Sequence, residues 1–220
     1  MLRKLFSYIL PVNINKSNSS ISKTLEVTWN NGKLVLDSKN TNYSYGSLQR
    51  ILRKGLHYIG FERIRGFQSV LILGVAGGSV IKTLVDEIGF KGKITGVEID
   101  KEIIDIANEY FHLNKIKNLA IIIDDAFEFV QKTKENYDLI IIDIFEDTEM
   151  PNFLFEDFFI NRVNFLLNVN GFILFNTMIS TESNKKRNES YRSRFNANYS
   201  VRLYPKVENY NELFTIKKLR

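Results

Sequence analysis

Glycine and acidic residues stand at the ends of four apolar runs in the middle of the chain. The first run, residues 69–73, leads into a glycine loop at 74–78, and a helical pattern begins at Ser79. Such a loop gathers backbone N–H groups and a helix N-terminus at one place, where a carboxylate or phosphate can bind. We therefore expect five loop residues to contact a cofactor: Gly74, Val75, Ala76, Gly77 and Gly78.

The second apolar run narrows the choice of cofactor. Residues 93–97 lead into Glu98, which lies 24 residues after Gly74. A carboxylate at this place accepts hydrogen bonds from both hydroxyls of a ribose, which fits NAD as well as S-adenosylmethionine (SAM). NAD fits less well, because Ala76 takes the place of the second glycine of the dinucleotide loop, where the backbone must approach a pyrophosphate.

The third and fourth runs also end in acidic residues. Residues 119–123 lead into Asp124, Asp125 and Ala126, and residues 137–142 lead into Asp143. The carboxyl ends of successive parallel strands converge on the crevice where open α/β sheets bind ligands. Asp125 can also be read as the N-cap of a helix that begins at Ala126, and the two roles are compatible.

The elements that must position these residues alternate along the chain. Near-continuous apolar runs separated by helices indicate a parallel sheet that is covered on both faces. We expect strands at 69–74, 93–98, 119–124, 137–143 and 171–176, helices at about 79–89, 101–111, 126–134, 153–167 and 182–194, and closing strands at 199–204 and 213–217. The predicted fold is α/β: a Rossmann-like, seven-stranded, mostly parallel sheet with helices on both faces and a final antiparallel pair.

A small β extension is predicted in front of this core. Residues 23–29 and 33–37 alternate apolar and polar side chains around the turn at 30–32, which is a strong hairpin signal. Residues 13–22 are rich in Asn and Ser and are expected to form a loop, and residues 1–12 a surface or docking helix. A helix at about 47–59 should pack on the sheet. The expected division is an N-terminal extension at 1–65 and a SAM-binding domain at 66–220.

Length and composition limit the architecture. With 220 residues, of which 44% are hydrophobic, the chain can bury one core and a small appendage. It has no cysteine, which excludes disulfides and thiolate metal sites and fits a reducing compartment, so we expect a cytoplasmic protein. His57 and His112 have no carboxylate or second histidine at metal-ligand spacing, and we expect no metal site.

The net charge of +5 is unevenly distributed. Residues 1–68 carry 11 basic and 3 acidic side chains, residues 69–180 carry 9 and 18, and residues 181–220 carry 10 and 4. Basic flanks can bind nucleic acid, but none of the usual reader motifs is present, and we expect no nucleic-acid partner. The expected partner is a small-molecule acceptor. No membrane-spanning helix is expected, and a homodimer is left open.

The same residues carry a family resemblance. Segments 70–78, 97–100, 125–129 and 137–143 resemble the motifs of the spermidine synthase-like branch of the class I SAM-dependent methyltransferase superfamily. The hairpin that ends at residue 37 resembles the small N-terminal β-domain of that branch. The resemblance implies that the glycine loop approaches the amino-acid end of the cofactor and that Glu98 takes the ribose hydroxyls. It also implies that Ile99 packs on adenine and that Asp125, next to Ala126, accepts from the adenine amino group.

Several positions depart from the aminopropyltransferases of that branch. Those enzymes carry an acid inside the glycine loop, where this chain has Ala76. They follow the fourth strand with an acidic turn whose first acid matches Asp143, while Glu146 only approximates the second. Their Tyr-His-Glu segment is represented at best by residues 45–47. We therefore expect much of the substrate half of an aminopropyltransferase to be missing.

Three functions of different classes remain from the sequence. The first is a SAM-dependent methyltransferase that acts on a small molecule, with Asp143 or Glu146 as the base. The second is aminopropyl transfer from decarboxylated SAM, which the acidic core favours because the acceptor is cationic. The third is a non-catalytic SAM-fold binding module. The cofactor is expected to be SAM or decarboxylated SAM.

Overall fold

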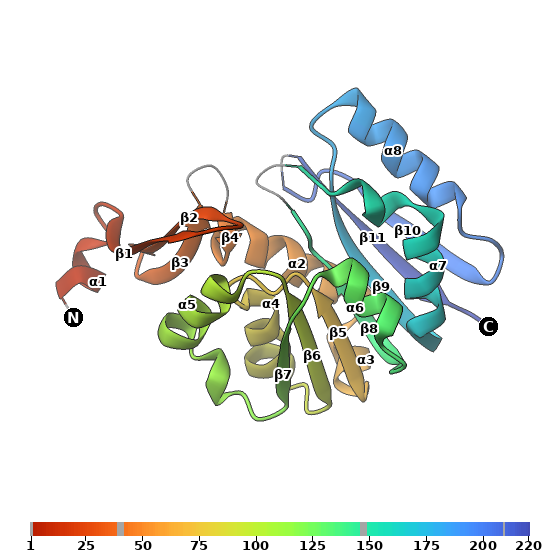
Figure 1. Ribbon diagram of the computed structural model, residues 1–220, viewed down its shortest axis with the longest axis horizontal. Coiled ribbons are helices and arrows are strands. Elements are labelled where there is room, and N and C mark those ends of the chain that lie inside the picture. The colour runs from red at the N-terminus through yellow and green to blue at the C-terminus, as the bar shows by residue number, and fades with distance from the viewer. Residues whose placement is uncertain (1, 39–41, 146–148, 209) are drawn as a thin grey trace.

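The computed structural model describes residues 2–38, 42–145, 149–208 and 210–220, which form two sheets. The strand order of the larger sheet is β10-β11-β9-β8-β5-β6-β7 (Figure 1). Its strands are β5 (Ser69–Leu73), β6 (Lys93–Glu98), β7 (Leu119–Ile123), β8 (Tyr137–Ile142), β9 (Leu167–Met178), β10 (Tyr199–Tyr204) and β11 (Asn211–Lys218). The first five are parallel, and β11 is antiparallel to both of its neighbours. The predicted seven-stranded, mostly parallel sheet is confirmed, and β5 is an interior strand between β8 and β6.

The two faces of the large sheet bury separate hydrophobic clusters. Alternate residues of a strand point to opposite faces, so Val70 and Ile72 pack on one side while Leu71 and Leu73 pack on the other. The first side is covered by α2 (Gly46–Ile59), α3 (Phe61–Arg65), α4 (Ser79–Lys82), η1 (Thr83–Ile88) and α5 (Lys101–Phe111). The second is covered by α6 (Ala126–Lys132), η3 (Asn152–Phe155), α7 (Asp157–Leu166) and α8 (Glu182–Ser193).

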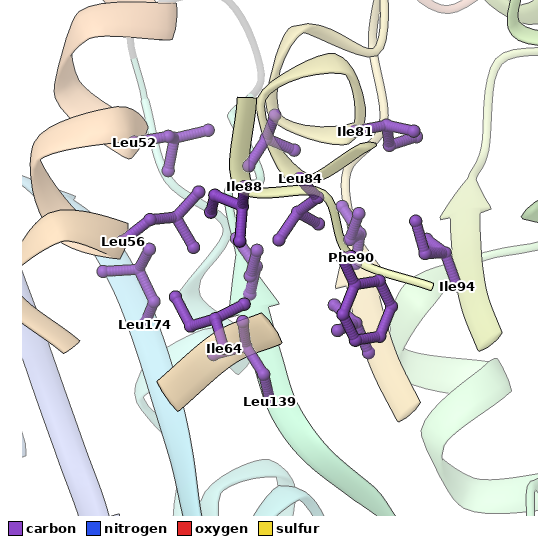
Figure 2. Close-up of a cluster of buried hydrophobic side chains, with 14 of the residues drawn as sticks. Leu52, Leu56, Ile64, Ile81, Leu84, Ile88, Phe90, Ile94, Leu139 and Leu174 are labelled. Atoms are coloured by element: carbon purple, nitrogen blue, oxygen red, sulfur yellow. The ribbon is translucent and has the colours of Figure 1, made fainter. Parts of the chain in front are cut away.

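Figure 2 shows part of the first cluster, where side chains of three helical segments converge. Leu56 of α2, Ile64 of α3 and Ile88 of η1 lie in one cluster with Leu139 and Leu174 of the sheet (Figure 2). The segment predicted as one helix at 79–89 begins as the α-helix α4 and continues as the π-helical turns of η1. The predicted helix at 153–167 is likewise divided into η3 and α7, and β9 begins directly afterwards at Leu167.

The N-terminal extension is a four-stranded antiparallel sheet with the order β1-β2-β3-β4. Its strands are β1 (Val12–Ser19), β2 (Lys23–Asn30), β3 (Lys33–Ser38) and β4 (Asn42–Ser44), and α1 (Leu2–Phe6) precedes them. The predicted hairpin of β2 and β3 is confirmed. The prediction of a loop at 13–22 is wrong for residues 13–19, which belong to β1 and pair with β2, while residues 20–22 form the turn between the two strands. The predicted helix at 1–12 is reduced to α1, and residue 1 lies outside the described part of the chain.

A buried aspartate joins the small sheet to the large one. Asp100 caps α5 by accepting from the backbone N–H of Glu102, and it also accepts from the hydroxyls of Ser19 (2.5 Å) and Ser22 (2.6 Å). Burial acts to raise the pKa of Asp100, but these hydrogen bonds outweigh it and the pKa is lowered. The turn between β1 and β2 is thereby held against the carboxyl end of β6. A short helix of three residues, η2 (Leu113–Lys115), follows α5.

Candidate active site

A cavity of about 840 Å³ opens at the carboxyl ends of the parallel strands. The ends of β5, β6, β7 and β8 form its floor, which is where open α/β sheets bind their ligands. The turn at 21–23 lies on one side, and Ser47, Leu48 and Ile51 of α2 lie on another. Its volume is within the range that holds a drug-sized ligand. The predicted convergence of the strand ends on one crevice is therefore observed.

Two of the five glycine-loop residues line the cavity, namely Gly74 and Ala76. Val75 is buried in the hydrophobic core instead. The two glycines that follow allow close packing, because a side chain at Gly77 would meet Ser44 and one at Gly78 would meet Leu113. The hydroxyl of Ser44 also accepts from the backbone N–H of Ser79, so the small sheet contributes to the start of α4.

Glu98 holds the glycine loop in place. Its side chain is only 8% exposed. One carboxylate oxygen accepts from the backbone N–H groups of Val75 (3.0 Å) and Ala76 (2.9 Å), and the other accepts from that of Asp100 (3.2 Å). Burial raises the pKa of Glu98, and the backbone N–H donors act against this rise. Since a carboxylate offers about four acceptor positions, one remains for a ligand hydroxyl.

The ends of β6 and β7 supply an apolar surface and further acids. Ile99 is 46% exposed and lines the cavity, as do Asp124, Asp125 and Ala126. Asp125 caps α6 by accepting from the backbone N–H groups of Phe127 (2.7 Å) and Glu128 (3.3 Å) through the same oxygen, Oδ1. The N-cap role that the sequence allowed is therefore present, and Asp125 also borders the cavity.

Asp143 lines the cavity directly after β8. Its Oδ1 accepts from the Nδ2 of Asn176 (2.8 Å), and the Oδ1 of Asn176 accepts from the Nδ2 of Asn211 (3.0 Å). Burial raises the pKa of Asp143 to about 6, against the effect of the Asn176 hydrogen bond, and Glu98 adds to the rise. A carboxyl group with this pKa can accept and release a proton near neutral pH.

The loop after β8 and the strand β9 also contribute to the cavity. Phe145, Phe153 and Asn176 are among its lining residues. Tyr45 stacks on Phe111, with ring centroids 4.6 Å apart, and is not among the cavity-lining residues. The predicted base Glu146 lies outside the described residues. Sequence reasoning missed Asn211, Met178 and the lining residues of α2, and the helical pattern of α2 gave no sign that one edge faces the cavity.

The described lining of the cavity is strongly acidic. It contains five carboxylates and one basic side chain, that of Lys23. The carboxylates belong to Glu98, Asp124, Asp125, Asp143 and Glu149. Such an excess of one sign in a concave site raises the local concentration of ligands of the opposite sign. The cavity therefore favours a cationic ligand.

We expect Gly74→Ala to lower the free energy of unfolding by about 2 to 5 kcal/mol. Gly74 has a φ of +88°, and a Cβ there would overlap the backbone carbonyl oxygen of Asp143. The matched control is Gly89→Ala, at a φ of +74° with no atom nearer than the Nε of Arg65 at 3.9 Å. Gly89→Ala should lower the free energy of unfolding by about 1 to 2 kcal/mol, which is the cost of placing a side chain at a positive φ without a steric clash. Urea unfolding of both variants measures the difference, and equal losses would contradict the close approach of the two strand ends.

Within the described residues, no helix has the length and apolar character needed to cross a membrane. In the same part of the chain, no group of three or more His, Cys, Asp or Glu side chains is arranged to hold a metal ion.

Comparison with known proteins gives the chain its relatives. The profile of the spermine/spermidine synthase domain matches residues 49–218. A polyamine aminopropyltransferase of Buchnera aphidicola subsp. Schizaphis graminum is 35% identical over 132 residues, which cover 57% of this chain and 46% of that protein. The chain thus spans less than half of the length of this curated relative.

Two solved structures resemble the fold. The crystal structure of spermidine synthase from Thermotoga maritima superposes with a TM-score of 0.69 at 20% identity, over 95% of this chain and 74% of that one. Human methyltransferase-like protein 13 in complex with SAH gives a TM-score of 0.65 at 19% identity, over 80% and 83% of the two chains. At these identities the likeness shows the fold alone.

Proposed function

This chain belongs to the spermine/spermidine synthase domain family, and on that premise we propose that it is a transferase that moves the aminopropyl group of decarboxylated SAM to a cationic amine. The amine would be a diamine or polyamine. The observation that carries the proposal is the charge of the cavity, in which five carboxylates face one basic side chain among the described residues. Decarboxylated SAM and a diamine are both cationic and carry no carboxylate, so both suit an acidic site.

The residues at the β5, β6 and β7 ends fit the cofactor. The exposed side of Ile99 offers an apolar face for adenine, and the free oxygen of Asp125 is available to its amino group. Glu98 retains one acceptor position for a ribose hydroxyl. Gly74 and Asp143 both line the cavity, and the sulfonium end would lie beside them. These four roles are part of the proposal.

Asp143 is proposed as the base. Decarboxylated SAM supplies a methylene carbon that is bound to a positively charged sulfur. The amine nitrogen bonds to this carbon, the carbon–sulfur bond breaks, and the sulfur leaves as the neutral thioether methylthioadenosine. The nitrogen can attack only after its ammonium form has lost a proton, and Asp143 is placed beside the cavity to take it. The raised pKa of Asp143, about 6, suits proton transfer near neutral pH. The remaining contribution of the protein is to orient the two reactants.

Methyl transfer from SAM is the second candidate, and one observation favours it. The glycine loop presents Ala76 and no acidic side chain to the cavity, so it provides no carboxylate partner for an aminopropyl ammonium group. The curated relative named above is a polyamine aminopropyltransferase, and this is why methyl transfer takes second place. Both reactions would use the same cofactor pocket and the same base.

Isothermal titration with decarboxylated SAM, SAM and NAD tests the choice of cofactor. We expect decarboxylated SAM to bind at least about tenfold more tightly than SAM, because the carboxylate of SAM would enter an acidic site. NAD should not bind, since its negatively charged pyrophosphate would have to enter the acidic cavity. Tighter binding of SAM would favour methyl transfer instead, and the absence of binding by all three would overturn the proposal.

A further inference from the structure

A row of three side chains crosses the large sheet beside the cavity. Asp143 follows β8, Asn176 belongs to β9 and Asn211 begins β11, and the three are joined by hydrogen bonds of 2.8 and 3.0 Å. We propose that Asn176 and Asn211 form an amide relay that holds Asp143 as an ionised hydrogen-bond acceptor, with Asn211 as a positioning residue that acts through Asn176. The inference rests on the proposed function only in calling Asp143 the base.

The direction of the hydrogen bonds carries the argument. A side-chain amide has one donor end and one acceptor end, and it can rotate to exchange them. Asn176 is fully buried, so its acceptor end needs a donor, and Asn211 supplies one from its Nδ2. With its acceptor end thus engaged, Asn176 must turn its donor end to Asp143. A donor stabilises the carboxylate, whereas the opposite orientation would present a carbonyl oxygen and favour the protonated acid.

Asn211 is itself held firmly by its surroundings. Its backbone N–H donates to the carbonyl of Glu208 (2.8 Å), and its own carbonyl accepts from the N–H of Val207 (2.9 Å). This turn is attached to α2, because Arg50 forms an ion pair with Glu208 (2.8 Å) and Lys54 donates to the carbonyl of Val207 (2.9 Å). The amide at the far end of the relay therefore starts from a backbone that α2 holds in place.

The charges around Asp143 do not provide this stabilisation. From β6 it is faced by Glu98, which raises its pKa. The other titratable groups that line the same cavity are Asp124 and Asp125 after β7, Glu149 after β8, and Lys23 of β2. The glycine loop and α2 present no titratable side chain to the cavity among their described residues. The hydrogen bond from Asn176 therefore lowers the pKa of Asp143, against burial and Glu98.

The test is a double-mutant cycle read by the titration of Asp143. The carboxyl carbon of Asp143 is followed by ¹³C NMR in the ligand-free protein, with Asp143→Asn as the reference that assigns the signal. We expect Asn211→Leu to shift the midpoint upward by about half to one pH unit, because Asn176 becomes free to turn its carbonyl toward the acid. Asn176→Leu should shift it further. In the Asn176→Leu background, Asn211→Leu should add nothing.

Two controls keep the result interpretable. Tyr210→Phe alters the exposed residue that precedes Asn211 in the chain and does not line the cavity, so the midpoint should stay where it is. Asn211→Ala repeats the main test in case leucine disturbs the strand. The relay would be overturned if the midpoint were unchanged in both Asn211 variants. It would also be overturned if Asn211→Leu shifted the midpoint by the same amount in the native protein and in Asn176→Leu.

The readout needs neither cofactor nor acceptor. A failure of the relay therefore leaves the proposed transfer reaction standing, while a failure of that reaction leaves the titration result intact. Where transfer is measured, the acidic limb of the pH–rate profile should move upward in Asn211→Leu by the same amount as the NMR midpoint. A purely structural role for Asn211 would lower the rate at all pH values without moving that limb.

Discussion

Replacing Asp143 with asparagine should reduce transfer turnover by about a hundredfold, which is the usual scale of general acid–base catalysis. Asparagine keeps the shape of the side chain and can still accept from Asn176, but it cannot take a proton from the attacking ammonium group. The measurement is the rate of product formation at saturating cofactor. Glu149→Gln, at an exposed residue of the same cavity, should alter turnover only a few fold. Equal losses in the two variants would show that the essential acid lies on the loop after β8.

The same substitution should make the protein more stable above pH 6. The pKa of Asp143 is raised in the folded protein, to about 6 from an ordinary value of 3.8, so the folded state binds this proton more tightly than the unfolded state. Stability from this group is therefore present at low pH and is lost as the pH rises from about 4 to about 6. Asp143→Asn removes that loss, and we expect a gain of about 1 to 2 kcal/mol at pH 8, reduced from the full linkage value because the carboxyl faces the cavity.

Urea unfolding at pH 5 and pH 8 checks the linkage. The difference in stability between the native protein and Asp143→Asn should be larger at pH 8 than at pH 5. The turnover of the native protein should rise with pH through an acidic limb near 6, because the base must be ionised. A stability difference that is the same at both pH values would mean that Asp143 titrates normally and that its burial has no functional consequence.

The second large effect is expected at Glu98. Glu98→Ala removes the acceptor of three backbone N–H groups, two of them in the glycine loop, together with the expected ribose contact. We expect cofactor binding to weaken by about 2 to 4 kcal/mol and the free energy of unfolding to fall by about 1 to 3 kcal/mol. Isothermal titration gives the first quantity and chemical denaturation the second.

Glu98→Gln separates the two roles. Glutamine retains one acceptor oxygen, which can serve the paired N–H groups of Val75 and Ala76, but it loses the charge that strengthens bonds to ribose hydroxyls. Its stability should lie nearer to that of the native protein than to that of Glu98→Ala. The surface variant Glu128→Ala, on α6 outside the cavity lining, should leave affinity unchanged. Native affinity in Glu98→Ala would mean that the cofactor binds elsewhere.

Local patterns were sufficient to predict the large sheet. The apolar runs that become β5, β6, β7 and β8 need cover on both faces, and the helices between them carry the matching apolar sides. The turn at 30–32 predicts its hairpin because Asn31 and Gly32 adopt positive φ values of 48° and 74°. In these segments the local preference and the tertiary structure agree.

Other features depend on contacts that sequence patterns do not carry. β1 is rich in Asn and Ser, which are poor strand formers, and it becomes a strand through pairing with β2 and through the bond from Ser19 to Asp100, 81 residues away. The link between Asn176 and Asn211 spans 35 residues and depends on the antiparallel pairing of β9 and β11. Glu98 was expected to face the ribose alone, and nothing in the sequence indicated that it also binds the glycine loop.

The most direct test of the central claim is the identity of the nucleoside product. The protein is incubated with a diamine such as putrescine in two separate reactions, one with decarboxylated SAM and one with SAM. The products of each reaction are identified by mass spectrometry. The account predicts methylthioadenosine together with a diamine that has gained one aminopropyl group, formed from decarboxylated SAM and formed about a hundredfold more slowly with Asp143→Asn. S-adenosylhomocysteine and a methylated amine, formed from SAM and in larger amount, would contradict it.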